Sequence, residues 1–135
     1  MGEPPNVVAV INSTTDVVDM LRIALEQAGL VVVSALTPEI RDGRVDLDRF
    51  VAQHEPKVIV YDIAPPYEPN WHLFEHVSSM PAMKGRQFVL TSTNPRHVER
   101  LAPPQEHIYE VIGKSEDIGR IVQAAREALR VRPSR

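Results

Sequence analysis

Residues 57–61 read Lys-Val-Ile-Val-Tyr, a nearly continuous apolar run that is followed at once by Asp62. A strand without polar alternation is expected to be buried on both faces, as parallel strands are when helices cover both sides of their sheet. The stretch therefore favours an α/β architecture in which Asp62 stands at the carboxyl end of a strand.

Four further apolar runs of strand length recur along the chain. They are Val7–Ile11, Leu30–Ser34, Gln87–Leu90 and Ile108–Ile112. Helical segments follow the runs, so the pattern is five strands alternating with five helices, which with right-handed crossovers predicts a doubly wound parallel sheet. A length of 135 residues suits one domain, with a core from about residue 6 to about residue 130.

The clearest helix is expected over Asp16–Ala28, with Gly29 as its stop. Its predicted apolar stripe consists of Val17, Met20, Leu21, Ala24, Leu25 and Ala28. A last helix is expected after Ser115, which is a good N-cap residue. The three helices between are predicted to begin at Asp46, Asn70 and Asn94.

Composition excludes several classes of function. The net charge of −3 and the lack of a basic cluster argue against nucleic-acid binding, and no apolar run approaches the roughly 18 residues of a membrane span. Without any cysteine the chain has no disulfide, thiol nucleophile, thiolate zinc site or iron–sulfur cluster. A cytoplasmic location is the default expectation.

Polar residues gather where the predicted strands end, which is where doubly wound sheets bind ligands. They are Asn12, Ser13, Asp62, Thr91, Ser92 and Lys114. The turn at residues 12–15 contains no glycine, which excludes a dinucleotide site or a P-loop after the first strand.

From Val7 to about Leu129 this layout resembles the receiver domain of two-component response regulators, which has a flavodoxin-like (βα)5 fold with strand order 2-1-3-4-5. Asp62 looks like the phospho-acceptor of that family, Thr91 like its conserved hydroxyl residue and Lys114 like its conserved lysine. A carboxylate that takes a phosphoryl group needs a hydroxyl donor and a cation for the transferred oxygens. The resemblance implies that Thr91 and Lys114 supply them.

The resemblance also implies a Mg²⁺ site made by Asp62, Asn12 and the backbone carbonyl of Ala64. In the family a pair of acidic residues ends the first strand, whereas this chain has Asn12 and Ser13 there. Because Mg²⁺ prefers carboxylate oxygens, the site is expected to be weakened or absent.

Two further family features differ. The proline after the family's lysine is replaced by Ser115, and its aromatic switch residue falls on Val111. Tyr109 lies two residues earlier, on the same strand face if the period of two holds, and is expected to serve in packing.

The leading interpretation is a receiver-like signalling domain of a two-component phosphorelay, in which Asp62 would accept a phosphoryl group. Its expected partner is a histidine kinase or another signalling protein. Output, or homodimer formation, would use the face of the fourth helix, fifth strand and fifth helix. The alternative is a pseudo-receiver that binds partners without phosphorylation. An independent enzyme is disfavoured, because phosphohydrolases of the haloacid dehalogenase type need a second acid where this chain has Ala64.

Overall fold

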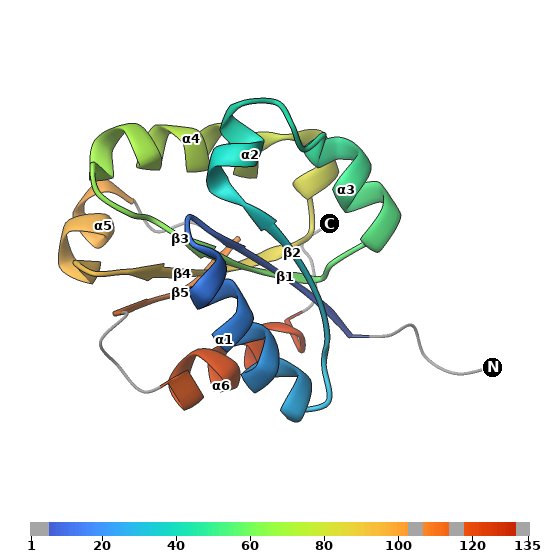
Figure 1. The fold of residues 1–135 in the computed structure, drawn as a ribbon. Coiled ribbons are helices and arrows are strands. Elements are labelled where there is room, and N and C mark those ends of the chain that lie inside the picture. The colour runs from blue at the N-terminus through green and yellow to red at the C-terminus, as the bar shows by residue number, and fades with distance from the viewer. Residues whose placement is uncertain (1–5, 103–106, 114–117, 132–135) are drawn as a thin grey trace.

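A computed structural model describes residues 6–102, 107–113 and 118–131 of the chain. Five strands form one parallel sheet in the order β2-β1-β3-β4-β5 (Figure 1). The strands are β1 (Val7–Asn12), β2 (Val31–Leu36), β3 (Val58–Asp62), β4 (Gln87–Ser92) and β5 (Ile108–Gly113). The predicted doubly wound sheet and its strand order are confirmed.

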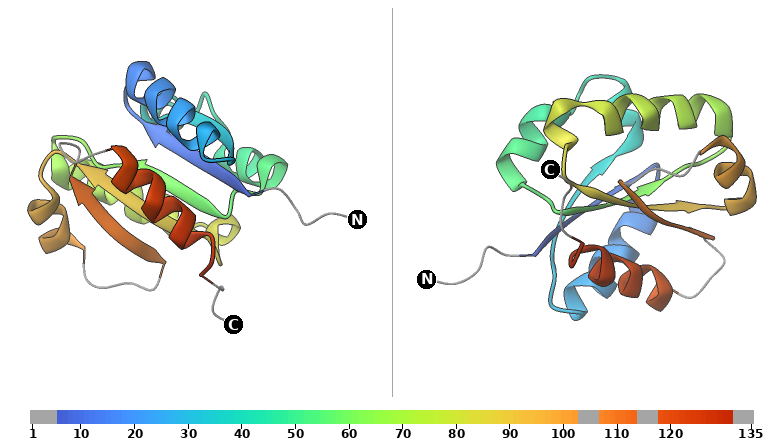
Figure 2. Two further views of the ribbon diagram at one scale, coloured as in Figure 1. Left: turned by 90° about the horizontal axis from the view of Figure 1, so that it is seen from below. Right: turned by 180° about the vertical axis from the view of Figure 1, so that it is seen from behind.

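Helices cover both faces of the sheet, as Figures 1 and 2 show. They are α1 (Thr15–Gln27), α2 (Thr37–Arg41), α3 (Leu47–His54), α4 (Tyr67–Ser79), the 3₁₀ helix η1 (Pro81–Met83), α5 (Pro95–Leu101) and α6 (Ile118–Ala128). Helices α1 and α6 lie side by side on one face, and α2 to α5 lie on the other. Each layer encloses its own apolar cluster against the sheet.

The segment between β2 and β3 forms two helices where the sequence predicted one, so the described residues contain six α-helices and not five. Gly43 has φ +76°, a left-handed conformation that favours glycine and ends α2. Asp46 then caps α3 by accepting the N–H of Arg49 at 3.2 Å, as predicted.

Two other helix signals are confirmed. The side chain of Asn94 accepts the N–H of His97 at 3.2 Å, and Pro95 takes the first helical position of α5. Gly29, at φ +87°, follows the end of α1. Ser115, the expected cap of the last helix, lies outside the described residues.

The predicted start of α4 at Asn70 is wrong, because the helix begins at Tyr67. Pro69 is the third residue of α4, where a backbone N–H has no acceptor within the helix and a proline costs nothing. Asn70 is thereby placed inside the first turn, and its side chain is available for other contacts.

The predicted stripe of α1 needs a correction as well. Met20 is half exposed, whereas Val18 is buried with Leu21 and Leu25. The side chains of residues 18, 21 and 25 face the sheet. Because each helical residue turns by about 100°, Met20 is about 200° from Val18 in one direction and about 160° in the other, and so lies on the opposite side of the helix. None of the described helices is both long and apolar enough to cross a membrane.

Candidate functional site

Asp62 and Thr91 meet at the carboxyl end of the sheet. The pairing of β3 with β4 sets the two residues in register, and the Thr91 hydroxyl donates a hydrogen bond of 2.8 Å to Oδ1 of Asp62. Asp62 is 4% exposed and Thr91 2% exposed. A largely desolvated carboxylate is thus held by a hydroxyl donor, which confirms that the fold brings these two predicted residues together.

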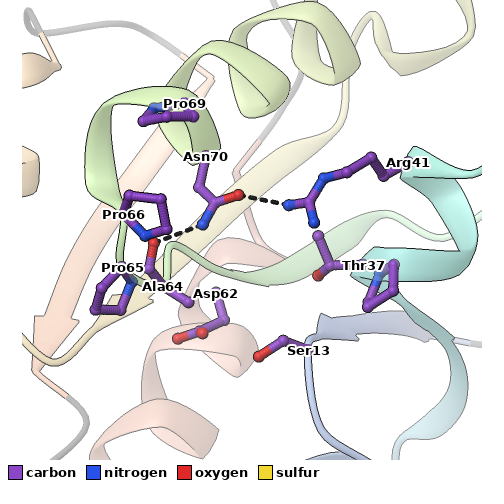
Figure 3. Close-up of a pocket in the computed structure, with 10 residues that line it drawn as sticks. Ser13, Thr37, Arg41, Asp62, Ala64, Pro65, Pro66, Pro69 and Asn70 are labelled. Atoms are coloured by element: carbon purple, nitrogen blue, oxygen red, sulfur yellow. Dashed lines mark hydrogen bonds between the residues drawn. The ribbon is translucent and has the colours of Figure 1, made fainter.

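A pocket of about 390 Å³ opens beside Asp62 (Figure 3). Its walls come from the ends of β1 and β3, from α2 and from the start of α4. The lining residues are Ser13, Thr37, Pro38, Arg41, Asp62, Ala64, Pro65, Pro66, Pro69 and Asn70. Asp62 and Ser13 lie at one side of the pocket, and Arg41 reaches across it from α2 toward Asn70.

Arg41, Asn70 and Ala64 form a chain of hydrogen bonds across the mouth of this pocket. Arg41 donates from Nη2 to Oδ1 of Asn70 at 2.6 Å, and Asn70 donates from Nδ2 to the carbonyl oxygen of Ala64 at 2.7 Å. Because the Asn70 amide is neutral, it orients the guanidinium without neutralising its charge. These hydrogen bonds therefore hold a positive charge at the pocket that Asp62 lines.

The charges at this edge of the sheet act on Tyr61, the neighbour of Asp62 in β3. Burial raises the pKa of the Tyr61 hydroxyl far above its usual range, Arg41 opposes this rise, and the carboxylate of Asp62 adds to it. The field of Arg41 thus extends to the residue next to Asp62.

Solved structures with the same architecture come from bacterial signalling proteins. A sensor protein from Polaromonas sp. JS666 superposes with a TM-score of 0.73 at 16% identity, covering 93% of this chain and 97% of the other. A response regulator from Thermotoga maritima gives 0.68 at 12% identity and coverage of 95% and 100%. A response regulator receiver domain from Methylobacillus flagellatus gives 0.62 at 14% identity and coverage of 90% and 99%.

The chain has the receiver fold. At these identities the likeness concerns the fold and leaves the chemistry of the site to this chain's own residues. A scan against protein-family models finds no match, and neither does a search of curated proteins.

Two of the oxygens that the resemblance assigned to Mg²⁺ each accept a hydrogen bond within the chain. Oδ1 of Asn12 accepts the N–H of Thr14 at 3.3 Å, and the Ala64 carbonyl accepts from Asn70. Across the described ranges no group of three or more histidine and acidic side chains could hold a metal ion. With one carboxylate, a neutral Ser13 and a guanidinium at the same pocket, the residues present do not fit Mg²⁺.

Two positions that the resemblance singled out, Lys114 and Ser115, lie outside the described residues. Val111 is half-buried on β5 and packs against the cluster under α3, α4 and α5. Tyr109 packs against the opposite cluster, under α1 and α6, so the expectation that it shares a face with Val111 is wrong. The register between β4 and β5 shifts after Phe88, and this irregularity breaks the period of two.

Sequence reasoning missed Arg41 and Thr37, which come from α2. A signal was present: Thr37-Pro38 comes within a few residues of the end of the second predicted strand at Ser34, so this segment was expected near the same sheet edge as Asp62. Asn70 was noticed only as a helix cap, and its bridge from Arg41 to Ala64 depends on where α4 begins.

The hydroxyl of Thr37 is a polar group without a visible partner. Thr37 is 6% exposed, and its Oγ1 makes no hydrogen bond to any described residue. Since a buried unsatisfied group costs about 1–3 kcal/mol, we expect Thr37→Val to leave the free energy of unfolding unchanged or to raise it by up to about 1 kcal/mol. Urea denaturation measures this, and a clear loss of stability would mean that the hydroxyl is satisfied in the folded protein.

Proposed function

We propose that this chain is a receiver-like signal-transduction domain of a two-component phosphorelay, in which Asp62 accepts a phosphoryl group. The observation that carries the proposal is the 2.8 Å hydrogen bond from the Thr91 hydroxyl to the buried Asp62 carboxylate beside an open pocket. A nucleophilic carboxylate, a hydroxyl donor and space for an incoming group are three of the features that phosphoryl transfer to an aspartate requires, and a cation is the fourth.

Lys114, which directly follows β5 in the sequence, belongs to this proposal as the expected cation for the transferred oxygens. The signal would arise by population shift, since a phosphoryl group adds about 1.5–2 negative charges that one conformation binds better than another. Val111 offers no aromatic ring to report the change. With the metal and switch positions changed, the conformational shift on phosphorylation is expected to be weak or absent.

Partners of this domain are expected to be proteins. A histidine kinase or another signalling protein would deliver the phosphoryl group in the cytoplasm. The α5–β5–α6 face is proposed for output or for a homodimer, because β5 ends the sheet and most of its residues are only half-buried. The net charge of −3 disfavours nucleic acid as the direct target of this domain.

The test is intact-mass analysis after incubation with acetyl phosphate, comparing the native chain with Asp62→Asn. One added phosphoryl group is expected on the native chain and none on the variant, because an amide cannot form the acyl phosphate. Thermal unfolding of Asp62→Asn serves as the check that its fold is retained. A native chain that stays unmodified would contradict the proposal, and labelling of both chains would place the acceptor elsewhere.

A second candidate is a phosphorylation-independent pseudo-receiver that works as a protein-binding module. One observation favours it: the oxygens of Asn12 and Ala64 that would face a metal ion are hydrogen-bonded within the chain. A native chain that takes no phosphoryl group but binds a partner equally well before and after Asp62→Asn would identify this function.

A further inference from the structure

The pocket beside Asp62 contains the groups that bind an oxyanion. Arg41 contributes a guanidinium, which presents a planar fork of donors suited to phosphate oxygens. Thr37 contributes a buried hydroxyl with no hydrogen-bond partner among the described residues. Ser13 adds a second hydroxyl on the side of Asp62 (Figure 3). An unused buried donor next to a cation indicates a site that awaits an anionic group.

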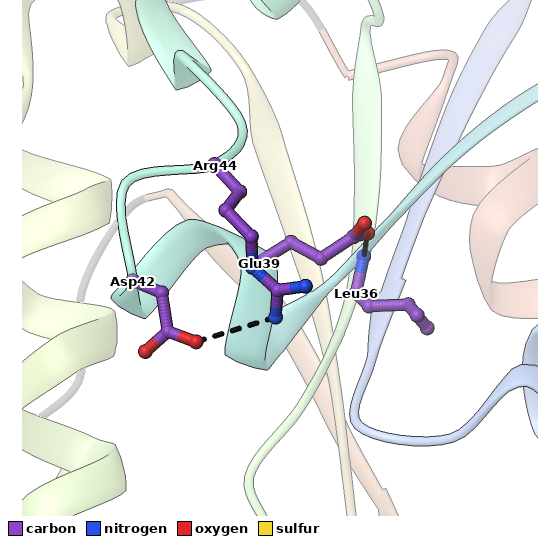
Figure 4. A network of polar contacts seen from close by, with 4 residues as sticks. All are labelled: Leu36, Glu39, Asp42 and Arg44. Atoms are coloured by element: carbon purple, nitrogen blue, oxygen red, sulfur yellow. Dashed lines mark hydrogen bonds and ion pairs between the residues drawn. The ribbon is translucent and has the colours of Figure 1, made fainter.

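The position of Arg41 is supported from both ends. At its tip, Asn70 accepts from the guanidinium and is itself fixed to the Ala64 carbonyl. At its base, Glu39 in α2 reaches back to the N–H of Leu36 at 3.3 Å (Figure 4). The guanidinium is therefore aimed before any ligand arrives, which limits the entropy lost on binding.

The turn after α2 is closed by contacts of its own. The N–H of Arg44 donates to the Glu39 carbonyl at 2.9 Å, and its guanidinium pairs with Asp42 at 3.2 Å (Figure 4). Arg44 thus closes the turn and is not among the residues that line the pocket, whereas Arg41 is.

We infer that Arg41 and Thr37 form the phosphoryl-binding site of this chain, so that Asp62 accepts and holds a phosphoryl group without a divalent cation. The inference rests on the proposed function and adds a mode of action to it. A metal ion normally neutralises the charge of the transferred group. Here the guanidinium of Arg41 would do so instead. Asn12 and Ser13 are neutral, so they do not join Asp62 in a cluster of acids that would attract a cation.

The chemical step is balanced without any further reactant. A carboxylate oxygen of Asp62 attacks the phosphorus of acetyl phosphate, an O–P bond forms, and the P–O bond to acetate breaks. Acetate leaves with the electron pair, and no proton or redox change is needed. The oxygens of the bound phosphoryl group, which carry about two negative charges, then lie against Arg41, and one of them accepts a hydrogen bond from the Thr37 hydroxyl.

The experiment follows acetyl phosphate labelling by intact mass with Mg²⁺ and, separately, with EDTA. We expect the native chain to gain one phosphoryl group at the same rate in both. Arg41→Gln should slow labelling on the order of 10²-fold in both, as when one preorganised oxyanion donor is lost. Arg44→Gln is the matched control, because it removes the same charge three residues away, outside the pocket, and should label like the native chain.

Each other result has a definite meaning. A native chain that labels only with Mg²⁺ keeps Asp62 as acceptor and overturns the inference, as do equal rates for Arg41→Gln and the native chain. Absence of labelling in both conditions overturns the inference together with the proposed function. Should Arg41→Gln fail to fold, Thr37→Val decides: it removes the hydroxyl that the inference assigns to the phosphoryl group, so a rate equal to that of the native chain would overturn the inference.

Discussion

Replacing Phe74 by alanine is expected to lower the free energy of unfolding by about 3–5 kcal/mol. Phe74 is fully buried on α4 and meets four rings. The ring centroids of Tyr61, Trp71 and Phe88 each lie 5.1 Å from it, and that of His107 lies 6.4 Å away. The substitution would leave a cavity between α4 and the sheet that rigid rings cannot fill.

Urea denaturation measures the effect as a lower midpoint concentration of urea, with no change in the slope of the unfolding free energy against urea concentration. Leu73→Ala on the same helix is the matched control, because Leu73 is only half-buried at the margin of the same cluster and should cost clearly less. Equal losses for the two variants would contradict the central place of Phe74. The effect bears on function too, since α4 carries Asn70 and thereby orients Arg41.

The second large effect is a designed gain of metal dependence. In Asn12→Asp/Ser13→Asp/Arg41→Gln, two carboxylates join Asp62 at the carboxyl end of the sheet and the competing guanidinium is gone. We expect labelling by acetyl phosphate to become dependent on Mg²⁺, with a difference on the order of 10²-fold between Mg²⁺ and EDTA.

An independent measurement is the thermal midpoint. A ligand that binds only the folded state adds about 2.7 kcal/mol of stability when its concentration is about a hundred times the dissociation constant. Mg²⁺ should therefore raise the thermal midpoint of the triple variant and leave that of the native chain unchanged. Ser13→Asp/Arg41→Gln is the second variant, because it avoids a carboxylate at the buried Asn12 position. A triple variant that folds but shows no effect of Mg²⁺ on either the labelling rate or the thermal midpoint would show that these residues do not govern metal binding.

Local patterns determined the architecture. Residues 58–61, directly before Asp62, are apolar throughout and are buried on both faces, as their composition predicted. Asp46, Asn94 and Gly29 mark helix ends through interactions that span only a few residues, so each could be predicted without knowing the rest of the fold. The meeting of Asp62 with Thr91 followed from the strand order that the receiver resemblance implied and from the rule that carboxyl ends gather at one edge.

What the tertiary structure alone decided is the character of the pocket. Arg41 and Asn70 are 29 residues apart, and their hydrogen bond depends on the split of α2 from α3 and on the early start of α4. The opposite faces of Tyr109 and Val111 likewise depend on a register shift between β4 and β5. Periodicity reports which side chains can be buried, because burial follows the repeat of one element. It cannot report which polar groups of different elements meet, since that depends on distances set only when the elements pack together.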